Sequence, residues 1–424
     1  MGRGRNRLTG RVALVGLALV MAAATIACGS SDDDSAGSGG GGGSGSGGSG
    51  SSRGFDGETI KVAGIGSATN FAEADVGAQA RFQRFNETNE LEGIQIEYTE
   101  FVDDRQDPAQ ATSEVRRLVT QERVFALVPN LSAVNPGDYL AQQQVPYVGM
   151  AFDNTYCSQE PDDSIWGFGY NGCLVPTDPP VMPDSYRNLY AYVQEQTGED
   201  QPSIALFSHD NQSGQNSTRF GRVGAEGAGF EVVYAESPVP VTTSDYSPYV
   251  QEWLSSDGGE APDAMYCLMS ISCLDIWAAV KAAGYEGTFQ TSLYSDLLIE
   301  PLAGTVASVF YNTEPNDGLQ QMQEDLEAFE PGTEVSSTNV FAYFAADMFI
   351  QAVKEAAPDI SPESVQQALA NQTWEIEGFV GPVQYPESTV APTPSCNALM
   401  LNDGTEWTVA RPYDCSDRQF EVEG

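Results

Sequence analysis

Basic residues are scarce in this sequence, and their scarcity excludes one large class of partners. The 424 residues carry 19 Lys+Arg against 60 Asp+Glu, which gives a formal net charge of −41. Four of the basic residues lie close to the start of the chain, at Arg3, Arg5, Arg7 and Arg11. Nucleic-acid binding needs Lys or Arg grouped against phosphates, so we expect no nucleic acid among the partners.

Histidine is nearly absent too, since His209 is the only one in the chain. A His-rich metal site is therefore excluded, and any Ser-His or Cys-His catalytic pair would have to use this residue. The sequence also lacks a Gly-x-Ser-x-Gly elbow, and its glycine run at 39–43 lacks the Lys of a phosphate-binding loop. We expect no enzyme, no metal and no cofactor, and we interpret His209 as a ligand contact or a surface residue.

The N-terminal segment is typical of an exported protein. Residues 1–27 combine an arginine-rich start, an apolar stretch at 12–21 and small residues directly before Cys28, which is the order of an export signal. The segment resembles a bacterial lipoprotein signal, in which Cys28 becomes the lipidated first residue. A secretory signal without lipid, with Cys28 as a spare thiol, is the alternative. Residues 28–57 are mostly Gly, Ser and Asp, a composition expected of a flexible tether.

The cysteines after Cys28 are even in number, which in an exported chain indicates disulfides. They are Cys157, Cys173, Cys267, Cys273, Cys396 and Cys415. Pairing of sequence neighbours is the simplest of several connectivities and gives 157–173, 267–273 and 396–415. Zinc is the weaker alternative, because the sequence has no Cys-x-x-Cys pair.

From Thr59 onward, short β-rich runs alternate with helical patterns. A first series has strands at 60–65, 94–98, 125–128 and 146–150, and one of its helices opens at Asp107-Pro108 with a carboxylate cap and a Pro in the first turn. After an irregular segment at 154–183, a second series has strands at 203–207, 230–234, 264–268 and 289–293. This alternation predicts two α/β units, each with a mostly parallel sheet covered by helices on both faces.

The last hundred or so residues change character. Helical patterns at 319–329, 339–356 and 362–370 are followed by a strand at 378–383. The turn residues Asn402-Asp403-Gly404 then predict a hairpin.

Three segments carry a resemblance to a known family: 60–66, 103–111 with its Asp107-Pro108 helix opening, and 204–210. They resemble the type I periplasmic binding proteins, above all the Leu/Ile/Val-binding receptors of amino-acid ABC transporters. The segment 378–409 is similar to the closing strands of that family. The resemblance implies an α/β fold of two doubly wound lobes with a ligand cleft between them. It further implies discontinuous lobes, with lobe one at 58–178 and 312–368, lobe two at 179–311 and 369–424, and crossovers near Pro179, Tyr311 and Trp374.

Ligands of open α/β sheets bind beyond the carboxyl ends of the strands, so the loops at those ends supply the candidate site. The candidates are Phe71, Ser132, Ala133, Ala151, Phe152 and Asp153 in lobe one, and Gln212, Ser270, Tyr294 and Asp296 in lobe two. By resemblance, Ser132 holds the ligand carboxylate, and Ala151 and Phe152 lie near the second loop that holds the ligand. The acidic residue with which the family grips a ligand ammonium aligns near Leu293. Phe71 fits a core position equally well, and Asp296 fits a helix cap.

These observations predict a lipid-anchored receptor on the extracytoplasmic face of the cell membrane, which delivers a small ligand to an ABC permease. The candidate positions hold two carboxylates, Asp153 and Asp296, and no Lys or Arg. An amino acid, or a related amide or zwitterion with an amine, therefore fits better than a dianion. A ligand-binding sensor lipoprotein without a permease is the alternative function.

Overall fold

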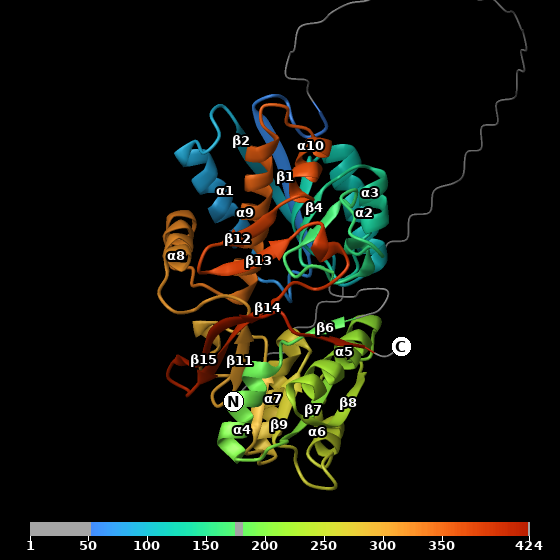
Figure 1. The fold of residues 1–424 in the computed structure, drawn as a ribbon, viewed down its shortest axis with the longest axis vertical. Helices are drawn as coiled ribbons and strands as arrows, with labels where there is room; N and C mark the ends of the chain where they lie inside the picture. The colour runs from blue at the N-terminus through green and yellow to red at the C-terminus, as the bar shows by residue number, and fades with distance from the viewer. Residues whose placement is uncertain (1–51, 174–180, 423–424) are drawn as a thin grey trace, which may run out of the picture. The chain divides into compact units, whose positions relative to one another are not determined.

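The computed structural model describes residues 52–173 and 181–422, and two large sheets organise them into two lobes (Figure 1). All of these residues belong to one structural unit, Gly48–Gly424. The predicted export signal, Cys28 and the tether up to residue 51 lie outside the described residues, as does the crossover expected near Pro179.

The sheet of the first lobe has five strands, all parallel, in the order β2-β1-β3-β4-β5. Their bounds are β1 (Thr59–Gly66), β2 (Gln95–Asp103), β3 (Ala126–Leu131), β4 (Tyr147–Gly149) and β5 (Gly167–Gly169). Every residue of the central strand β3 is buried, as expected of a parallel strand with both faces covered.

Helices cover both faces of this sheet. They are α1 (Ala74–Thr88), α2 (Pro108–Arg117) with the π-helical turn η1 (Leu118–Glu122), α3 (Gly137–Gln142), η2 (Asn154–Tyr156), α8 (Asp317–Phe329), α9 (Ser337–Ala356) and α10 (Pro362–Leu369). The predicted opening of α2 is confirmed, because the Asp107 carboxylate accepts a hydrogen bond from Gln110 N at 2.8 Å and Pro108 occupies the first turn.

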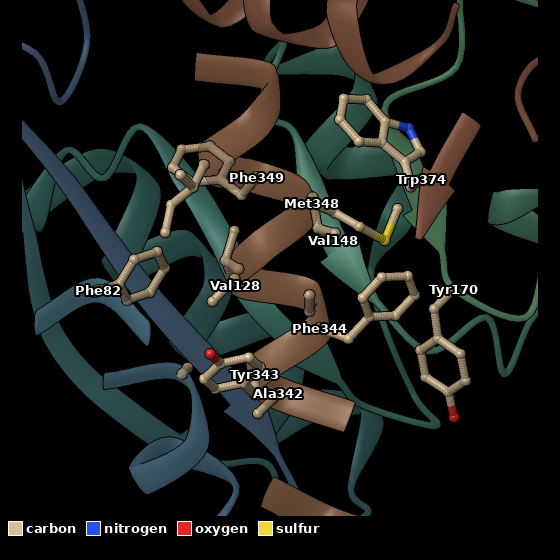
Figure 2. Close-up of a cluster of buried hydrophobic side chains, with 14 of the residues drawn as sticks. Phe82, Val128, Val148, Tyr170, Ala342, Tyr343, Phe344, Met348, Phe349 and Trp374 are labelled. Atoms are coloured by element: carbon tan, nitrogen blue, oxygen red, sulfur yellow. The ribbon is translucent and has the colours of Figure 1, made fainter. Parts of the chain in front are cut away.

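Helix α9 is the centre of the largest core and is buried along most of its length. Figure 2 shows Met348 and Phe349 of this helix among Phe82 of α1, Val128 of β3 and Val148 of β4. These contacts bring a helix from the last hundred residues onto a sheet formed by strands between residues 59 and 169, so the first lobe is discontinuous in sequence.

A hairpin after α10 corrects one boundary expected from the sequence. Strands β12 (Thr373–Ile376) and β13 (Val380–Gln384), with the turn η5 (Glu387–Thr389), pack on the first lobe and not, as expected from residue 369 on, on the second. The Tyr385 hydroxyl donates to Gly169 O at 2.9 Å, and the Trp374 indole donates to Leu369 O at 3.1 Å. The apolar Trp374 and Val383 are buried in the same core as α9.

The sheet of the second lobe has seven strands in the order β15-β14-β11-β10-β9-β7-β8. They are β7 (Ser203–His209), β8 (Glu231–Val239), β9 (Ala264–Cys267), β10 (Thr288–Thr291), β11 (Val306–Val309), β14 (Ser395–Asn402) and β15 (Trp407–Ser416). The first five in sequence pair in parallel, and the predicted hairpin β14-β15 adds antiparallel strands at the β11 edge. Its turn is confirmed at Asn402, whose side-chain oxygen accepts from Gly404 N at 2.8 Å.

Helices also cover this sheet, and a small strand pair lies beside it. They are α4 (Arg187–Thr197), α5 (Gln212–Ala228), α6 (Ser247–Trp253), η3 (Ser270–Ser272), α7 (Cys273–Ala282) and η4 (Asp296–Leu298), while β6 (Val181–Pro183) pairs with β16 (Gln419–Glu421). Separate buried clusters form with α6 and α7 on one side and with α4 and α5 on the other. Both lobes are therefore doubly wound α/β units, and the predicted fold class is confirmed.

Candidate ligand-binding cleft

A cavity of about 710 Å³ is lined by residues of both lobes. Its lining comes mostly from segments that follow the carboxyl ends of strands, among them Phe71 after β1, Phe152 after β4, Ser270 after β9 and Tyr294 after β10. The first turn of α9, residues 336–338, and the start of α5 add hydroxyl and amide groups. This is the place where an open α/β sheet binds its ligand, and here two such sheets contribute to one cavity.

Four of the predicted site residues line this cavity: Phe71, Phe152, Ser270 and Tyr294. The rings of Phe71 and Phe152 are 5.8 Å apart and tilted by 50°. The Tyr294 ring lies 5.1 Å from that of Trp407 and 6.2 Å from that of Tyr311. Burial raises the pKa of Tyr294 to about 12, so its hydroxyl is neutral at physiological pH.

Ser132 does not line the cavity, contrary to the role implied by the resemblance. It is fully buried, and its oxygen accepts from Val134 N at 3.3 Å. Its hydroxyl is also hydrogen-bonded to the Asp104 carboxyl, whose pKa is raised by burial in spite of that bond. The hydroxyl is therefore used inside the first lobe. Its neighbour Ala133 is also absent from the lining.

Neither predicted carboxylate lines the cavity. Asp153 caps η2, accepting from Thr155 N at 2.8 Å and from Thr155 Oγ1 at 2.6 Å, and burial raises its pKa. Asp296 is exposed, although its neighbours Ser295 and Leu297 line the cavity. Of the two carboxylates expected to hold a ligand amine, Asp153 is thus bound to Thr155, and Asp296 lies outside the lining.

Ala151 and Gln212 are the two remaining predicted site residues. Ala151 is buried outside the lining, where its N–H donates to Asn171 Oδ1 at 2.8 Å. Gln212 is the first residue of α5, but its side chain lies outside what the structure describes.

The sequence reasoning missed an aromatic group that lines the cavity. Tyr170, Phe310 and Phe341 lie with ring centroids 5.0 Å (Tyr170–Phe310), 5.1 Å (Tyr170–Phe341) and 4.3 Å (Phe310–Phe341) apart, and all three pairs are stacked. Figure 2 shows Tyr170 beside Phe344, a buried residue of α9 that also lines the cavity. Tyr170 follows β5, whereas Phe310 follows β11, so no local pattern joins them.

The lining is almost free of charge. Among the described residues that form it, none is Lys, Arg or His, and Glu73 is the one acidic residue. The pKa of the nearby Glu334 carboxyl is raised, first by partial burial and then by the negative charges of Asp296 and Glu73. The part of the chain that the structure describes also has no group of three His, Cys, Asp or Glu placed to hold a metal ion. Neutral hydroxyls, amides and rings therefore dominate the site.

All three predicted disulfides are present, and each lies beside this lining. Cys173 of the 157–173 bridge follows the lining residues Tyr170 and Asn171 in sequence. The 267–273 bridge closes a loop that contains Ser270 and Ile271, and Cys396 of the third bridge itself lines the cavity. Ser270 has a left-handed backbone with φ of 48°, which is unusual for a residue other than glycine. The bridges therefore connect to the segments that a ligand would touch.

Comparison with known proteins agrees with this architecture. Residues 61–404 match the model of a family described as periplasmic binding protein, and the chain belongs to that family. Its members are solute-binding proteins and not enzymes. No curated protein sequence matches the chain significantly.

Solved structures share the fold at low sequence identity. A possible leucine/isoleucine/valine-binding protein from Rhodopirellula baltica has a TM-score of 0.68 and 16% identity, with 84% of this chain and 96% of that chain covered. A branched-chain amino acid substrate-binding protein from Streptococcus pneumoniae, solved with isoleucine, has a TM-score of 0.63 and 17% identity, with 84% and 100% covered. A solute-binding protein from R. palustris, solved with benzoate, has a TM-score of 0.65 and 14% identity, with 85% and 98% covered.

Proposed function

We propose that this protein is a lipid-anchored, extracytoplasmic receptor that captures a small molecule between its lobes and delivers it to an ABC permease. The observation that carries this function is the cavity of about 710 Å³ lined by the carboxyl-end segments of both sheets. A volume of this size suits a small organic molecule. Domain closure around such a site is a common way to trap a ligand.

The permease is inferred from similar proteins. One solved structure with the same fold is named as an ABC transporter substrate-binding protein from Aeropyrum pernix, with a TM-score of 0.67 and 16% identity. The isoleucine-bound and benzoate-bound proteins also carry transporter names. Isoleucine and benzoate differ in charge and shape, so they leave the ligand of this chain open, and we retain a small molecule with a polar group and an apolar body.

The lipid anchor is inferred from the sequence around Cys28. No helix in residues 52–173 and 181–422 is long and apolar enough to cross a membrane. A Cys28→Ser variant should therefore move from the membrane fraction to the soluble fraction of the producing cells, because lipidation of the cysteine would be lost. A Cys396→Ser variant is the matched control, since Cys396 lies in the described fold, and it should remain with the membrane. Equal membrane association of the Cys28→Ser variant would refute the anchor.

The function itself is tested with the full chain purified from producing cells. Mass spectrometry of the small molecules that copurify should identify a ligand, and adding the ligand-loaded chain to vesicles that contain the permease should stimulate ATP hydrolysis. The chain freed of ligand is the control. A bound ligand without any stimulation by permeases encoded beside the chain would favour the sensor function instead.

A further inference from the structure

We propose that the cleft binds a ligand that presents an aromatic ring and carries no carboxylate or other negative charge, such as an aromatic amide or amine. The inference rests on the proposed function, because it names the class of ligand for that same cleft. It is drawn from the rings and the charges around the cavity.

The first observation is the stacked group of Tyr170, Phe310 and Phe341. The planes of these rings differ by 15° to 27°, so the three rings lie nearly parallel to one another at the cavity wall. Phe310 and Phe341 are only partly buried. Aromatic pairs are stabilised beyond the burial of their area, so a further ring placed here would be favoured over an aliphatic group of equal size.

The second observation is that aromatic rings reach the cavity from other directions as well. Phe71 and Phe152 approach from loops of the first lobe, 5.8 Å apart. Tyr294 approaches from the second lobe, and the Tyr186 and Tyr266 rings meet there edge to face at 5.6 Å. Closure of the lobes would therefore bring rings of both lobes onto the same ligand.

The third observation is the charge of the lining. A carboxylate enclosed here would meet no Lys, Arg or His among the described lining residues. Burying an unpaired carboxylate is unfavourable, and Glu73, Asp296 and Glu334 near the cavity carry charge of the same sign. An amide or hydroxyl of the ligand can instead bond to the neutral Ser, Thr and Asn groups that make up the polar lining.

An aliphatic zwitterion is also a poor match. Position 293, where the resemblance places the acid that grips an ammonium, is Leu, and it lines the cavity. The carboxylate of such a ligand would lack a cation among the described lining residues, whereas an amide or amine without a carboxylate avoids that cost.

The test uses matched probes that differ only in charge or only in the ring. Calorimetry on the ligand-free full chain is run with benzamide against benzoate, indole-3-acetamide against indole-3-acetate, and benzylamine against cyclohexylmethylamine, with L-isoleucine as a further probe. In each pair we expect the aromatic member without negative charge to bind at least about tenfold more tightly, because its partner either buries an unpaired charge or loses the ring contacts. Tighter binding of the carboxylates or of L-isoleucine, or no binding of any aromatic probe, would overturn the inference.

Variants separate the ring from the charge. Phe341→Leu keeps an apolar side chain and removes the ring, so it should weaken the best aromatic probe by about three- to tenfold. Phe329→Leu is the matched control, because Phe329 at the end of α8 is also partly buried but does not line the cavity, and the probe's affinity should not change. Leu293→Arg places a cation in the lining and should abolish the preference for benzamide over benzoate. An unchanged preference in Leu293→Arg, or an equal loss in both Phe variants, would contradict the assignment.

Failure of this inference differs from failure of the proposed function. An aliphatic or anionic ligand that copurifies with the full chain and stimulates a permease would overturn the aromatic class and support the receptor. A chain that binds the aromatic amides but stimulates no permease would support the aromatic class of ligand and contradict the proposed receptor function.

Discussion

The Arg81 guanidinium donates from Nε to Asp347 Oδ1 at 2.7 Å and thereby joins α1 to α9, across 266 residues of sequence. Arg81 is only 1% exposed, and its other nitrogens donate to both carboxylate oxygens of Glu90, at 2.7 and 3.1 Å. Although burial disfavours its charged form, the attraction of Asp347 and Glu90 is strong enough to raise the pKa of Arg81. A fixed, buried cation thus holds α9, whose first turn reaches the cavity.

Replacing this cation should destabilise the protein strongly. Arg81→Met leaves the Asp347 carboxylate without its ion-pair partner, while Glu90 keeps Lys354 at 3.2 Å, and breaking a buried ion pair on one side typically costs about 3–5 kcal/mol. Urea unfolding followed by circular dichroism measures this loss. Lys61→Met is the control, because the 3.9 Å pair of Lys61 with Glu97 is exposed and should change stability by less than about 1 kcal/mol. Similar losses of unfolding free energy in the two variants would show that the buried ion pair stabilises the protein no more than the exposed one.

One disulfide should contribute mainly to the stability of the fold and another mainly to ligand affinity. The 157–173 bridge closes a loop with a sequence separation of 16, for which loop entropy suggests about 3 kcal/mol of stability. The 267–273 bridge has a separation of only 6, so its double Ser variant should lose less stability. That variant should lose ligand affinity instead, because the bridge encloses Ser270 and Ile271 of the lining.

Thermal unfolding and calorimetry with the copurified ligand measure the two effects separately. A large loss of stability with intact affinity in the 267–273 variant would reverse this prediction. Alkylation before reduction should find no free thiol at these six cysteines in the exported protein.

Stability should respond to the titration of Asp104, which is 1% exposed. Burial raises its pKa in the folded state, outweighing hydrogen bonds from Ser132 and Gln106 N. The native state therefore holds a proton that the unfolded state has released, so the contribution of this group decreases as pH rises from about 4, its ordinary pKa, through the raised native value.

Asp104→Asn should flatten this decrease, because an amide has the same shape and does not titrate. Unfolding free energies at several pH values between about 4 and 7 test this. Asp56→Asn is the control with the opposite sign, since hydrogen bonds from Thr59 N and Glu58 N lower the pKa of the exposed Asp56. A pH dependence that is the same with and without Asp104 would argue against the assignment.

Exposed apolar side chains at the cavity should contribute to closure. Leu297 is 74% exposed and lines the cavity, so closing the lobes would remove its surface from water, at roughly 25 cal/mol per Å². Leu297→Asp should weaken binding of the copurified ligand about tenfold or more, since it would place a charge in the closing surface. Val241→Asp is the control, because Val241 is 55% exposed and outside the lining.

Small-angle scattering adds a direct measure of the same motion. The radius of gyration of the wild-type chain should decrease when the ligand binds, and the decrease should be smaller for Leu297→Asp at the same ligand concentration. A scattering curve that does not change with any bound ligand would contradict closure.

Local patterns were enough to predict the main elements of the fold. The capping carboxylate of Asp107, the alternation of strands and helices, and the Asn402-Asp403-Gly404 turn each act within a few residues, so the sequence shows them directly. The hairpin at 373–384 was expected in the second lobe, because its position depends on distant contacts such as that of the Tyr385 hydroxyl with Gly169 O, which no local pattern shows. Strand β11, between β10 and β14 in the second sheet, was not predicted from the sequence.

The site was predicted only in part, because some of its contacts are local in sequence and others are not. Loops at strand ends are visible in the sequence, and four of the candidates in them line the cavity. The hydrogen bonds that direct Ser132 and Asp153 elsewhere involve Asp104 and Thr155, and their geometry depends on the folded turn. The stacked rings of Tyr170, Phe310 and Phe341 meet only after the chain has crossed between the lobes.

Because the chain returns late to its first lobe, the core of that lobe can be completed only late in synthesis. The first lobe begins at β1, yet α9 and the β12-β13 hairpin that complete its core come after every parallel strand of the second lobe. Until residues 337–356 have been made, Val128 and Val148 of the first sheet and Phe82 of α1 lack their contacts with α9. The lobe that starts first is therefore completed late, and a chain that stops before residue 337 would leave a large apolar surface without its cover.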